Sequence, residues 1–312
     1  MKAWMRVLTV SFTSSKLKKK FVFGENYLQG KDDLSIDVQI HKYMSSLKDN
    51  CTVKISNLPY DIIVQLIQGE YYDLEIKAGY RNTGTQTVFK GGVLYMSNSL
   101  DDTHTNTLIV LGASNLVAKY GQSRINLTLN SGINMYSALN YICKKANIPN
   151  SNISSQLKKS FIQDITNVNQ TAASFLNTLA ENNKSIIINA DQSVGSPVTM
   201  YDASKSKNRV IKLKKNFINL VGGFPQLDST GLRLNIMPTF NIMCGDVIDI
   251  DNSIIDISVD NGGSYSNFTK GYYLDKDGMY TVYEVTYSLQ NRGSSFSAGI
   301  LAKSYSLISS IL

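Results

Sequence analysis

The chain has 312 residues, of which 43% are hydrophobic and 18% charged, a balance typical of folded globular proteins rather than disordered ones. Cys51, Cys143 and Cys244 are widely spaced and form no CxxC pair, which argues against a disulfide framework and against a zinc site. No apolar run reaches the ~18 residues that a membrane span needs, and the N-terminus lacks the cleavage pattern of a secretory signal. We therefore expect a protein that is made in a cytoplasm and has no membrane span.

The formal net charge is +7, and much of the excess lies in short lysine runs. These runs are Lys16 to Lys20, Lys144-Lys145, Lys158-Lys159 and Lys212 to Lys215. Such runs are typical of solvated faces. Nucleic-acid binding would require that they converge with exposed aromatic side chains, and the sequence leaves that convergence open.

The first part of the chain is rich in predicted strands. Tyr72, Leu74 and Ile76 alternate with Asp73 and Glu75, and this period of two predicts a half-buried strand over 72–80. Further strands are expected over 51–56, 87–99 and 105–114. Short strands at this spacing favour a barrel or a sandwich.

Two stretches of this region are less regular. Residues 61–70 predict either a short helix or another strand. The pair Gly91-Gly92 predicts a bulge or a tight bend inside the strand that contains it.

The pattern changes to helical spacing near residue 126. Apolar residues recur every three or four positions over 131–147, where Ser131 is a candidate N-cap and Pro149 stops the helix. A second helix is expected over 171–182, with Thr171 as its cap. Together with a short strand at 185–189, these helices predict a small α+β unit.

Strands return after residue 190. The candidates are 209–215, 231–238, 245–251, 253–259 and 278–293. In the last of these, alternate residues again share a face, and Asp277-Gly278 predicts a hairpin turn immediately before it.

Motifs that carry chemistry are scarce. The two histidines, His41 and His104, lie in no HxH or HExxH arrangement, and the serine-elbow and nucleotide-binding motifs are absent. Asp101, Asp102 and His104 form the densest polar cluster and are a candidate metal site. A turn before the next strand explains this cluster with fewer assumptions.

Carboxylate pairs were considered because glycosidases need two of them. Glu70, Asp73 and Glu75 are close in sequence, but the last two share the polar face of a strand, and Glu181 ends a helix. A solvated face explains these residues better than a catalytic pair does.

Asp246, Asp249 and Asp251 follow Gly245 with the spacing DxxDxD, which allows a calcium loop as one hypothesis. The residues between them are apolar and suit a sheet. The alternative is a strand whose wet face carries Asp249 and Asp251, and this interpretation fits the pattern better.

Residues 216–252, "NFINLVGGFPQLDSTGLRLNIMPTFNIMCGDVIDIDN", resemble the second barrel of baseplate hub proteins from Mu-like and T-even-like bacteriophages. In that family a strand ends in a Gly-x-Pro step, an apolar strand runs from a Gly to a Pro, and a Gly-Asp turn begins an alternating strand. These roles fall here to Gly223 and Pro225, to Gly231 and Pro238, and to Gly245-Asp246.

Residues 51–114 resemble the first barrel of the same hub proteins, which is similar to the tail-tube protein. The resemblance implies a mainly β fold with an α+β insert. It implies a tube-like barrel over 1–125, a helix-containing domain over 126–190 and a second tube-like barrel over 191–312, with interleaved barrels as an alternative.

The resemblance also implies a structural, non-catalytic role with no cofactor and no metal. In such hubs a trimer adapts the sixfold tail tube to the threefold spike and surrounds the channel through which DNA passes. The implied partners are further copies of the chain, the tail tube, spike and tape-measure proteins and other baseplate proteins. The implied location is the tail baseplate of a virion assembled in the host cytoplasm.

The sequence leaves two other function classes open, and it leaves open what the C-terminal segment contacts. A tail-associated peptidoglycan hydrolase would need a carboxylate pair or a zinc triad, and a nucleic-acid or polysaccharide binder would use the lysine runs and the tyrosines. The apolar C-terminus is expected either to pack on the core as a last strand or helix, or to dock onto the spike or a neighbouring subunit. The docking residues would be Leu307, Ile308, Ile311 and Leu312.

Overall fold

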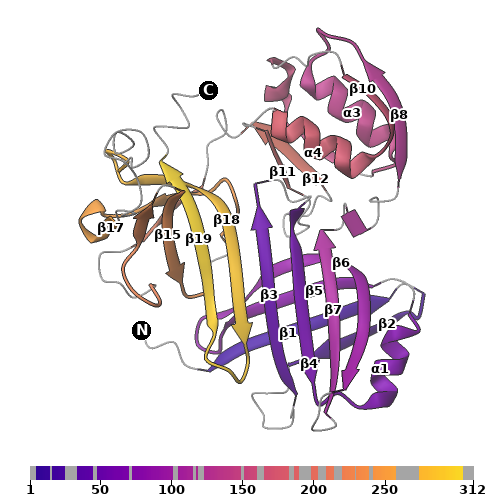
Figure 1. Ribbon diagram of the computed structural model, residues 1–312, viewed down its shortest axis with the longest axis vertical. Helices are drawn as coiled ribbons and strands as arrows, with labels where there is room; N and C mark the ends of the chain where they lie inside the picture. The colour runs from indigo at the N-terminus through magenta and orange to yellow at the C-terminus, as the bar shows by residue number, and fades with distance from the viewer. Residues whose placement is uncertain are drawn as a thin grey trace, which may run out of the picture.

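The structure, a computed structural model, describes residues 5–14, 16–24, 34–44, 48–69, 72–100, 105–114, 117–118, 123–148, 151–159, 165–182, 186–189, 198–202, 209–213, 220–228, 230–238, 242–257 and 274–304. It is mainly β with a small helix-containing part (Figure 1), which confirms the expected fold class. Within these ranges no helix is both long and apolar enough to cross a membrane.

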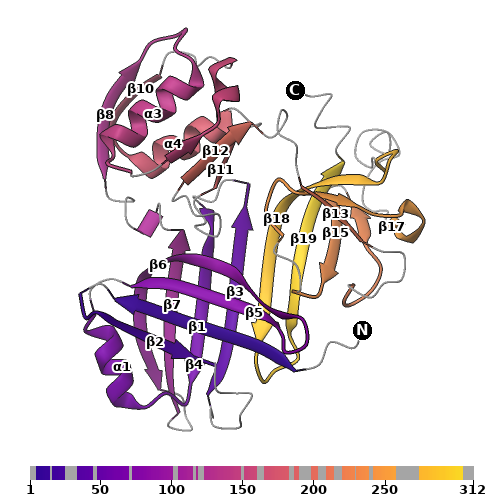
Figure 2. The same cartoon turned by 180° about the vertical axis from the view of Figure 1, so that it is seen from behind.

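The N-terminal strands form two crossing layers. The elements are β1 (Arg6–Ser14), β2 (Lys19–Phe23), β3 (Ser35–Tyr43), β4 (Asn50–Ser56), α1 (Tyr60–Ile67), β5 (Asp73–Tyr80), β6 (Gly84–Leu100) and β7 (Asn106–Ser114). In Figure 2, β1, β2 and β5 cross obliquely over β3, β4 and β7. The long strand β6 pairs with β5 through its first half and with β7 through its second half, and so joins the two layers.

The predicted alternation in β5 is present. Leu74, Ile76 and Ala78 are fully buried between the layers, where Phe12 and Tyr72 meet edge to face with ring centroids 6.3 Å apart. The ambiguous stretch after Pro59 is the helix α1, because its buried residues fall on one helical face rather than on alternate positions.

The bulge predicted at Gly91-Gly92 lies elsewhere. The ladder shifts register at Val88 against β5 and at Leu94 against β7, one on each side of the glycine pair. Gly91 instead permits close approach of β7, because a Cβ there would lie 2.1 Å from the carbonyl oxygen of Ala113. The bulge was therefore misplaced, since composition alone does not distinguish a bulge from a close backbone contact.

Residues 124–202 form a separate unit with its own apolar core, here called the middle unit. Its elements are β8 (Arg124–Leu129), α3 (Met135–Lys145), β9 (Ser151–Ile153), the 3-10 helix η3 (Ser155–Lys159), β10 (Ile165–Thr171), α4 (Ala172–Asn182), β11 (Ile186–Asn189) and β12 (Val198–Asp202). Leu139 and Leu176 are completely buried where α3 and α4 pack over these short strands.

One of the two predicted helix caps is confirmed. The Thr171 hydroxyl accepts a hydrogen bond from the Ser174 amide at 3.1 Å, as expected for the N-terminus of α4. The other prediction was wrong: α3 is capped by Asn134, whose side chain accepts from the Ser137 amide at 2.8 Å, and not by Ser131. Asn and Ser cap equally well, so composition did not decide between them.

The C-terminal strands are β13 (Val210–Lys212), β14 (Gln226–Asp228), β15 (Gly231–Ile236), β16 (Val247–Asp249), β17 (Asp256–Ile257), β18 (Met279–Gln290) and β19 (Phe296–Ser304), with a 3-10 helix η5 (Asn252–Ile254). The turn predicted at Asp277-Gly278 is present and leads into β18. It does not form a hairpin, because the first residues of β18 pair with β16 on one side and with β19 on the other.

A single large sheet joins the first and last thirds of the chain. Its order is β17-β14-β15-β19-β18-β3-β4-β7-β6-β5-β1-β2, so the junction is the antiparallel pair β18 and β3. One continuous apolar core contains residues from both thirds, including Val38, Leu74, Val285 and Ile300. The middle unit lies beyond one end of this body (Figure 1). The division of the sheet into two barrels stays a prediction.

Replacing Asn134 with Ala should lower the free energy of unfolding of the middle unit by ~1 kcal/mol, because the Ser137 amide loses its partner. Ser131→Ala is the matched control and should change it by less than ~0.5 kcal/mol, since Ser131 lies outside the helix on an exposed turn. Urea unfolding followed by circular dichroism at the helical band measures both. Equal effects of the two substitutions would contradict the assignment of the cap.

Candidate functional surface

One side of the large sheet is polar across its central strands. In β3, Ile36, Val38 and Ile40 are buried, and the residues between them point to the opposite side. In β18, Tyr287 and Leu289 are buried in the same way. Because neighbouring strands pair in register, the outward residues of one strand lie beside those of the next and form one surface.

We call this surface the polar face. It contains Arg233 and Asn235 of β15, Ser297 and Gly299 of β19, Thr286, Ser288 and Gln290 of β18, Asp37, Gln39 and His41 of β3, Thr52 and Lys54 of β4, and Thr107 and Ile109 of β7. Most of these side chains are small or neutral. The surface therefore holds water without a strong field of either sign.

Glu284 of β18 also lies on the polar face, two residues before Thr286 and opposite Leu301. The charges of Asp37, Lys54 and Arg233 are offset locally. Asp37 lies directly opposite Lys54 in the ladder, and its carboxylate accepts a hydrogen bond from the Gln290 amide at 2.9 Å. His41 and Thr286 are cross-strand neighbours whose side-chain atoms are 3.5 Å apart. A hollow of about 470 Å³ opens where β15, β18 and β19 meet.

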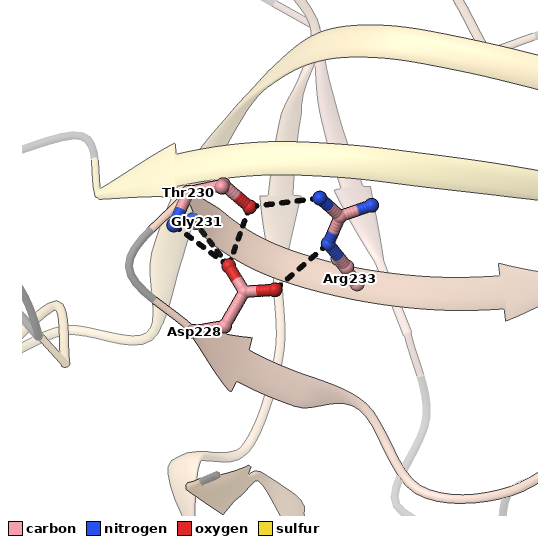
Figure 3. A network of polar contacts seen from close by, with 4 residues as sticks. All are labelled: Asp228, Thr230, Gly231 and Arg233. Carbon is pink, nitrogen blue, oxygen red and sulfur yellow. Dashed lines mark hydrogen bonds and ion pairs between the residues drawn. The ribbon is translucent and has the colours of Figure 1, made fainter. Parts of the chain in front are cut away.

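Arg233 is held on the polar face by the turn between β14 and β15 (Figure 3). The Asp228 carboxylate accepts from the Arg233 Nε at 2.9 Å and from the backbone amides of Thr230 and Gly231 at 2.7 and 3.2 Å. It also accepts from the Thr230 hydroxyl, which in turn accepts from Arg233 at 3.0 Å. Burial alone would raise the pKa of Asp228, but the hydrogen bonds from Thr230 and Arg233 outweigh it and lower this pKa.

Gly245 and Asp246 lie in the turn before β16 and are bound to β18. The Gly245 amide donates to the Val282 carbonyl, and the Val282 amide donates to the Asp246 carbonyl, both at 2.8 Å. The buried Asp246 carboxylate accepts from the Arg209 guanidinium at 2.5 Å and from the Met243 amide at 2.8 Å. Asp246 therefore stabilises this turn, and both of its carboxylate oxygens already accept hydrogen bonds from the protein.

The same turn is where the middle unit reaches the large sheet. A Cβ at Gly245 would lie 2.6 Å from Cδ1 of Ile187 and 3.0 Å from the hydroxyl of Tyr201, so a larger residue would have to displace the ends of these side chains. The backbone also requires glycine, because φ is +91°. Burial, and then the negative charge of Asp246, raise the pKa of Tyr201 to about 12. Tyr201 thus stays neutral at this contact.

The calcium hypothesis for the aspartates after Gly245 has no support in the geometry. Ile248 and Ile250 are buried, while Asp249 and Asp251 are half-exposed on the other side of the strand. Asp251 accepts from the Ser253 amide at 3.0 Å and so caps the 3-10 helix η5. Among the described residues, no group of three or more His, Cys, Asp or Glu side chains is placed to hold a metal ion.

The remaining turn residues lie at the edges of the C-terminal strands. Gly223 has φ of +128° in an exposed turn, and the buried Pro225 accepts a hydrogen bond from the Asp256 amide at 2.7 Å. Pro238 is buried two residues beyond the end of β15. Together with the turn at Gly245, these residues fix strand ends and are not gathered into one site.

The other candidates divide in two groups. Glu75 accepts from the Thr87 hydroxyl at 3.3 Å and pairs with Lys77 at 3.7 Å, as a solvated sheet face would, and Asp73 is half-buried at the start of the same strand. The following candidates lie outside the described residues: Glu70, Asp101, Asp102, His104, Leu307, Ile308, Ile311 and Leu312.

Sequence reasoning missed two strands of the polar face, β3 and β19. β3 carries a period of two in Ile36, Val38 and Ile40, and β19 has the same period in Ala298, Ile300 and Ala302. The signal was present in "SIDVQIHKY" and "FSAGILAKS".

No family model matches the chain, and no curated protein matches it in sequence. Solved structures do match it in fold. A 43 kDa tail protein of prophage MuSo2 from Shewanella oneidensis is 11% identical, with a TM-score of 0.57 over 95% of this chain and 96% of that one. A tail protein from Neisseria meningitidis is 9% identical, with a TM-score of 0.58 over 97% of each chain.

A third match is an Escherichia coli component of the type VI secretion system, described as similar in structure to the T4 bacteriophage tail proteins gp27 and gp5. It is 12% identical, with a TM-score of 0.54 over 87% of this chain and 73% of that one. The chain has the phage tail-protein fold. The matches span nearly the whole chain, so the middle unit and both sets of strands belong to this fold.

In this tail-protein fold, Gly245→Ala should destabilise the chain by ~1–2 kcal/mol more than Gly132→Ala does. Both glycines have a positive φ, of +91° and +85°, but a Cβ at Gly132 meets nothing within 4 Å whereas one at Gly245 meets Ile187. The difference between their urea unfolding free energies isolates the steric contact. Equal losses would mean that the middle unit shifts freely to make room.

Asp228→Asn should lower the free energy of unfolding by ~1 kcal/mol at pH 7, because the charged acceptor of Arg233 is lost. Since the folded-state pKa of Asp228 is lowered, the stabilisation is present above the ordinary carboxyl pKa and is lost as pH falls through the lowered value. The difference between wild type and variant should therefore shrink as the pH falls below the ordinary carboxyl range and through the lowered pKa of Asp228.

Urea unfolding of both proteins at a series of pH values measures this loss. Asp256→Asn, at an exposed carboxylate of β17, is the control and should differ from wild type by less than ~0.5 kcal/mol at pH 7. A difference for Asp228→Asn that does not change with pH would contradict the assigned role of the carboxylate.

Proposed function

We propose that the chain is the structural hub of a phage tail baseplate, or of a related injection particle, and forms a ring of three copies. The observation that carries the proposal is the single sheet that runs through both β-rich thirds, with a core on one side and the polar face on the other. The shared fold with phage tail proteins supports a structural role in a tail.

The polar face would line the central channel of the ring. DNA carries one negative charge per ~1.7 Å of helix axis and binds tightly to clustered lysine and arginine. A channel wall must therefore be wet without being strongly basic. The polar face fits this need, because its Lys54 lies opposite Asp37 and its Arg233 is paired with Asp228.

The arrangement of two β-rich thirds suits an adaptor between symmetries. Three copies would present six strand-rich units to a sixfold tail tube while keeping threefold symmetry toward a spike. The partners of the hub would be the tail tube, spike and tape-measure proteins and other baseplate proteins, with DNA present only in transit. The proposal places the protein in the virion tail after assembly in the host cytoplasm and assigns it no catalytic step.

The middle unit would remain outside the channel wall in this arrangement. Its core is separate from that of the large sheet, and it meets the sheet at the turn at Gly245. We propose that it contacts other baseplate proteins around the hub.

The purified full-length chain should form a trimer of ~100 kDa, three times the chain mass of 34.6 kDa. Light scattering coupled to size exclusion, repeated over a hundredfold range of concentration, measures the mass. Electron microscopy of the same sample should show rings with an open centre. A monomer throughout the concentration range, or a closed assembly without a central opening, would contradict the proposed function.

A further inference from the structure

The positive charge of the chain is concentrated in one stretch of the sequence. Between Asp102 and Asp164 there is no acidic residue. The stretch contains six lysine and arginine residues, which are Lys119, Arg124, Lys144, Lys145, Lys158 and Lys159. It therefore has a net excess of six positive charges, in a chain whose whole net charge is +7. Charge segregated in this way acts as a field on its surroundings rather than as separate ion pairs.

The fold brings two of the lysine runs together. The helix α3 ends with Lys144-Lys145, and the 3-10 helix η3 ends with Lys158-Lys159. The two helices pack on each other, and Leu157 of η3 is completely buried in the core of the middle unit. The Lys158 ammonium lies over the Tyr136 ring of α3, 5.1 Å from its centroid, and so links η3 to α3.

We call the outward side of α3 and η3 the basic face, which consists of Tyr136, Tyr141 and the four lysines at 144, 145, 158 and 159. All four lysines are exposed, and Tyr141 is 44% exposed with the Lys145 ammonium 5.7 Å from its ring centroid. Among the described residues, no carboxylate pairs with any of these lysines. The convergence of lysine runs with aromatic side chains that the sequence left open is present here.

The helix dipole explains only part of this arrangement. Lysines in the last turn of a helix are stabilised by its unpaired carbonyl groups, which accounts for Lys144-Lys145 at the end of α3. The dipole of a five-residue 3-10 helix is much smaller, yet η3 also ends with two lysines. Nor does a dipole require that acidic residues be absent from the whole stretch. The basic face therefore fits a negatively charged partner.

The residue types of the basic face distinguish between kinds of partner. Protein interfaces are depleted in lysine and enriched in arginine, and α3 and η3 carry four lysines and no arginine. Single-stranded nucleic acid stacks its bases on free aromatic rings, whereas ammonium groups already lie over Tyr136 and Tyr141. A lipid surface needs only compact positive charges, with tyrosines at the level of the headgroups.

We propose that the basic face docks on a membrane surface rich in anionic phospholipid headgroups. The apolar side of α3 is occupied by the core of the middle unit, where Leu139 and Ile142 are completely buried. The helix therefore does not insert among the acyl chains, and the lysines meet the phosphate groups from above. In both views α3 lies farther from the large sheet than α4 does (Figures 1 and 2), so the contact is remote from the polar face.

This inference goes beyond the hub function and needs neither the ring nor the channel, because the basic face belongs to a single chain. A trimer that does not bind vesicles would overturn the membrane contact alone. A monomer that binds them through the basic face would overturn the hub function alone.

Sedimentation with lipid vesicles tests the proposal on the full-length chain. At ~0.1 M salt the wild type should bind vesicles of one part phosphatidylglycerol to two parts phosphatidylcholine and should not bind vesicles of phosphatidylcholine alone. Binding should be lost near 1 M salt, because the Debye length falls from ~10 Å to ~3 Å. Equal binding to both kinds of vesicle, or binding to neither, would overturn the proposal.

Substitutions locate the contact. The variant Lys144→Gln with Lys159→Gln should bind the anionic vesicles about 25-fold more weakly, because each lysine near such a surface contributes a factor of ~5. The control Lys20→Gln with Lys276→Gln removes the same charge from two exposed lysines outside the middle unit and should bind within about twofold of wild type. Circular dichroism checks that both are folded. Equal weakening by the two variants would overturn the proposal, since total charge would then be the cause.

Competition identifies the class of anion. A single-stranded oligonucleotide of mixed sequence and a polyglutamate peptide, each at the same concentration of negative charge as the vesicles, are offered to the wild type. Weaker binding of both than of the vesicles supports a lipid surface. Tighter binding of the oligonucleotide, lost in Lys144→Gln with Lys159→Gln, would assign the basic face to nucleic acid and overturn the proposal. Tighter binding of polyglutamate would assign it to an acidic protein and overturn the proposal as well.

Discussion

The whole architecture depends on the antiparallel pairing of β18 with β3, two strands about 250 residues apart in the chain. Side chains close the pair at its end: the Gln290 amide donates to Asp37 at 2.9 Å, and the buried Asn291 accepts from the Ile36 amide at 2.8 Å and donates to the Leu34 carbonyl at 3.1 Å. A buried amide with these partners fixes the register of the two strands. Without this register the polar face would break into two unrelated surfaces.

β18 also positions the rest of the molecule. At the C-terminal end of β18, the turn that follows it brings Phe296 against the Tyr80 ring, with the ring centroids 5.4 Å apart. The Arg6 guanidinium lies over the Phe296 ring, 5.3 Å from its centroid. At the other end of β18, Val282 exchanges backbone hydrogen bonds with the turn at Gly245, which in turn contacts Ile187 of the middle unit. One strand therefore sets the placement of the N-terminal strands, the C-terminal strands and the middle unit relative to one another.

Local features of this fold were accessible from the sequence, and pairing was not. Alternation around Leu74 and the cap at Thr171 depend on neighbouring residues, so the pattern alone predicted them. The cap of α3 was assigned to Ser131 rather than Asn134, because two good capping residues lie within one turn of the same helix start. The polar face needs the register between Thr286 and His41, and no short-range pattern contains that information.

The same rule of alternation explains the polar face and the exposed edge of β6. Where apolar and polar residues alternate, as in β3, one side of a strand enters the core and the other meets water. In "LYMSNSL", residues 94–100 of β6, this alternation fails, since Tyr95 lies on the wet side and Leu100 on the dry side, and both are exposed. Among the described residues, these two side chains stay 57% and 60% exposed.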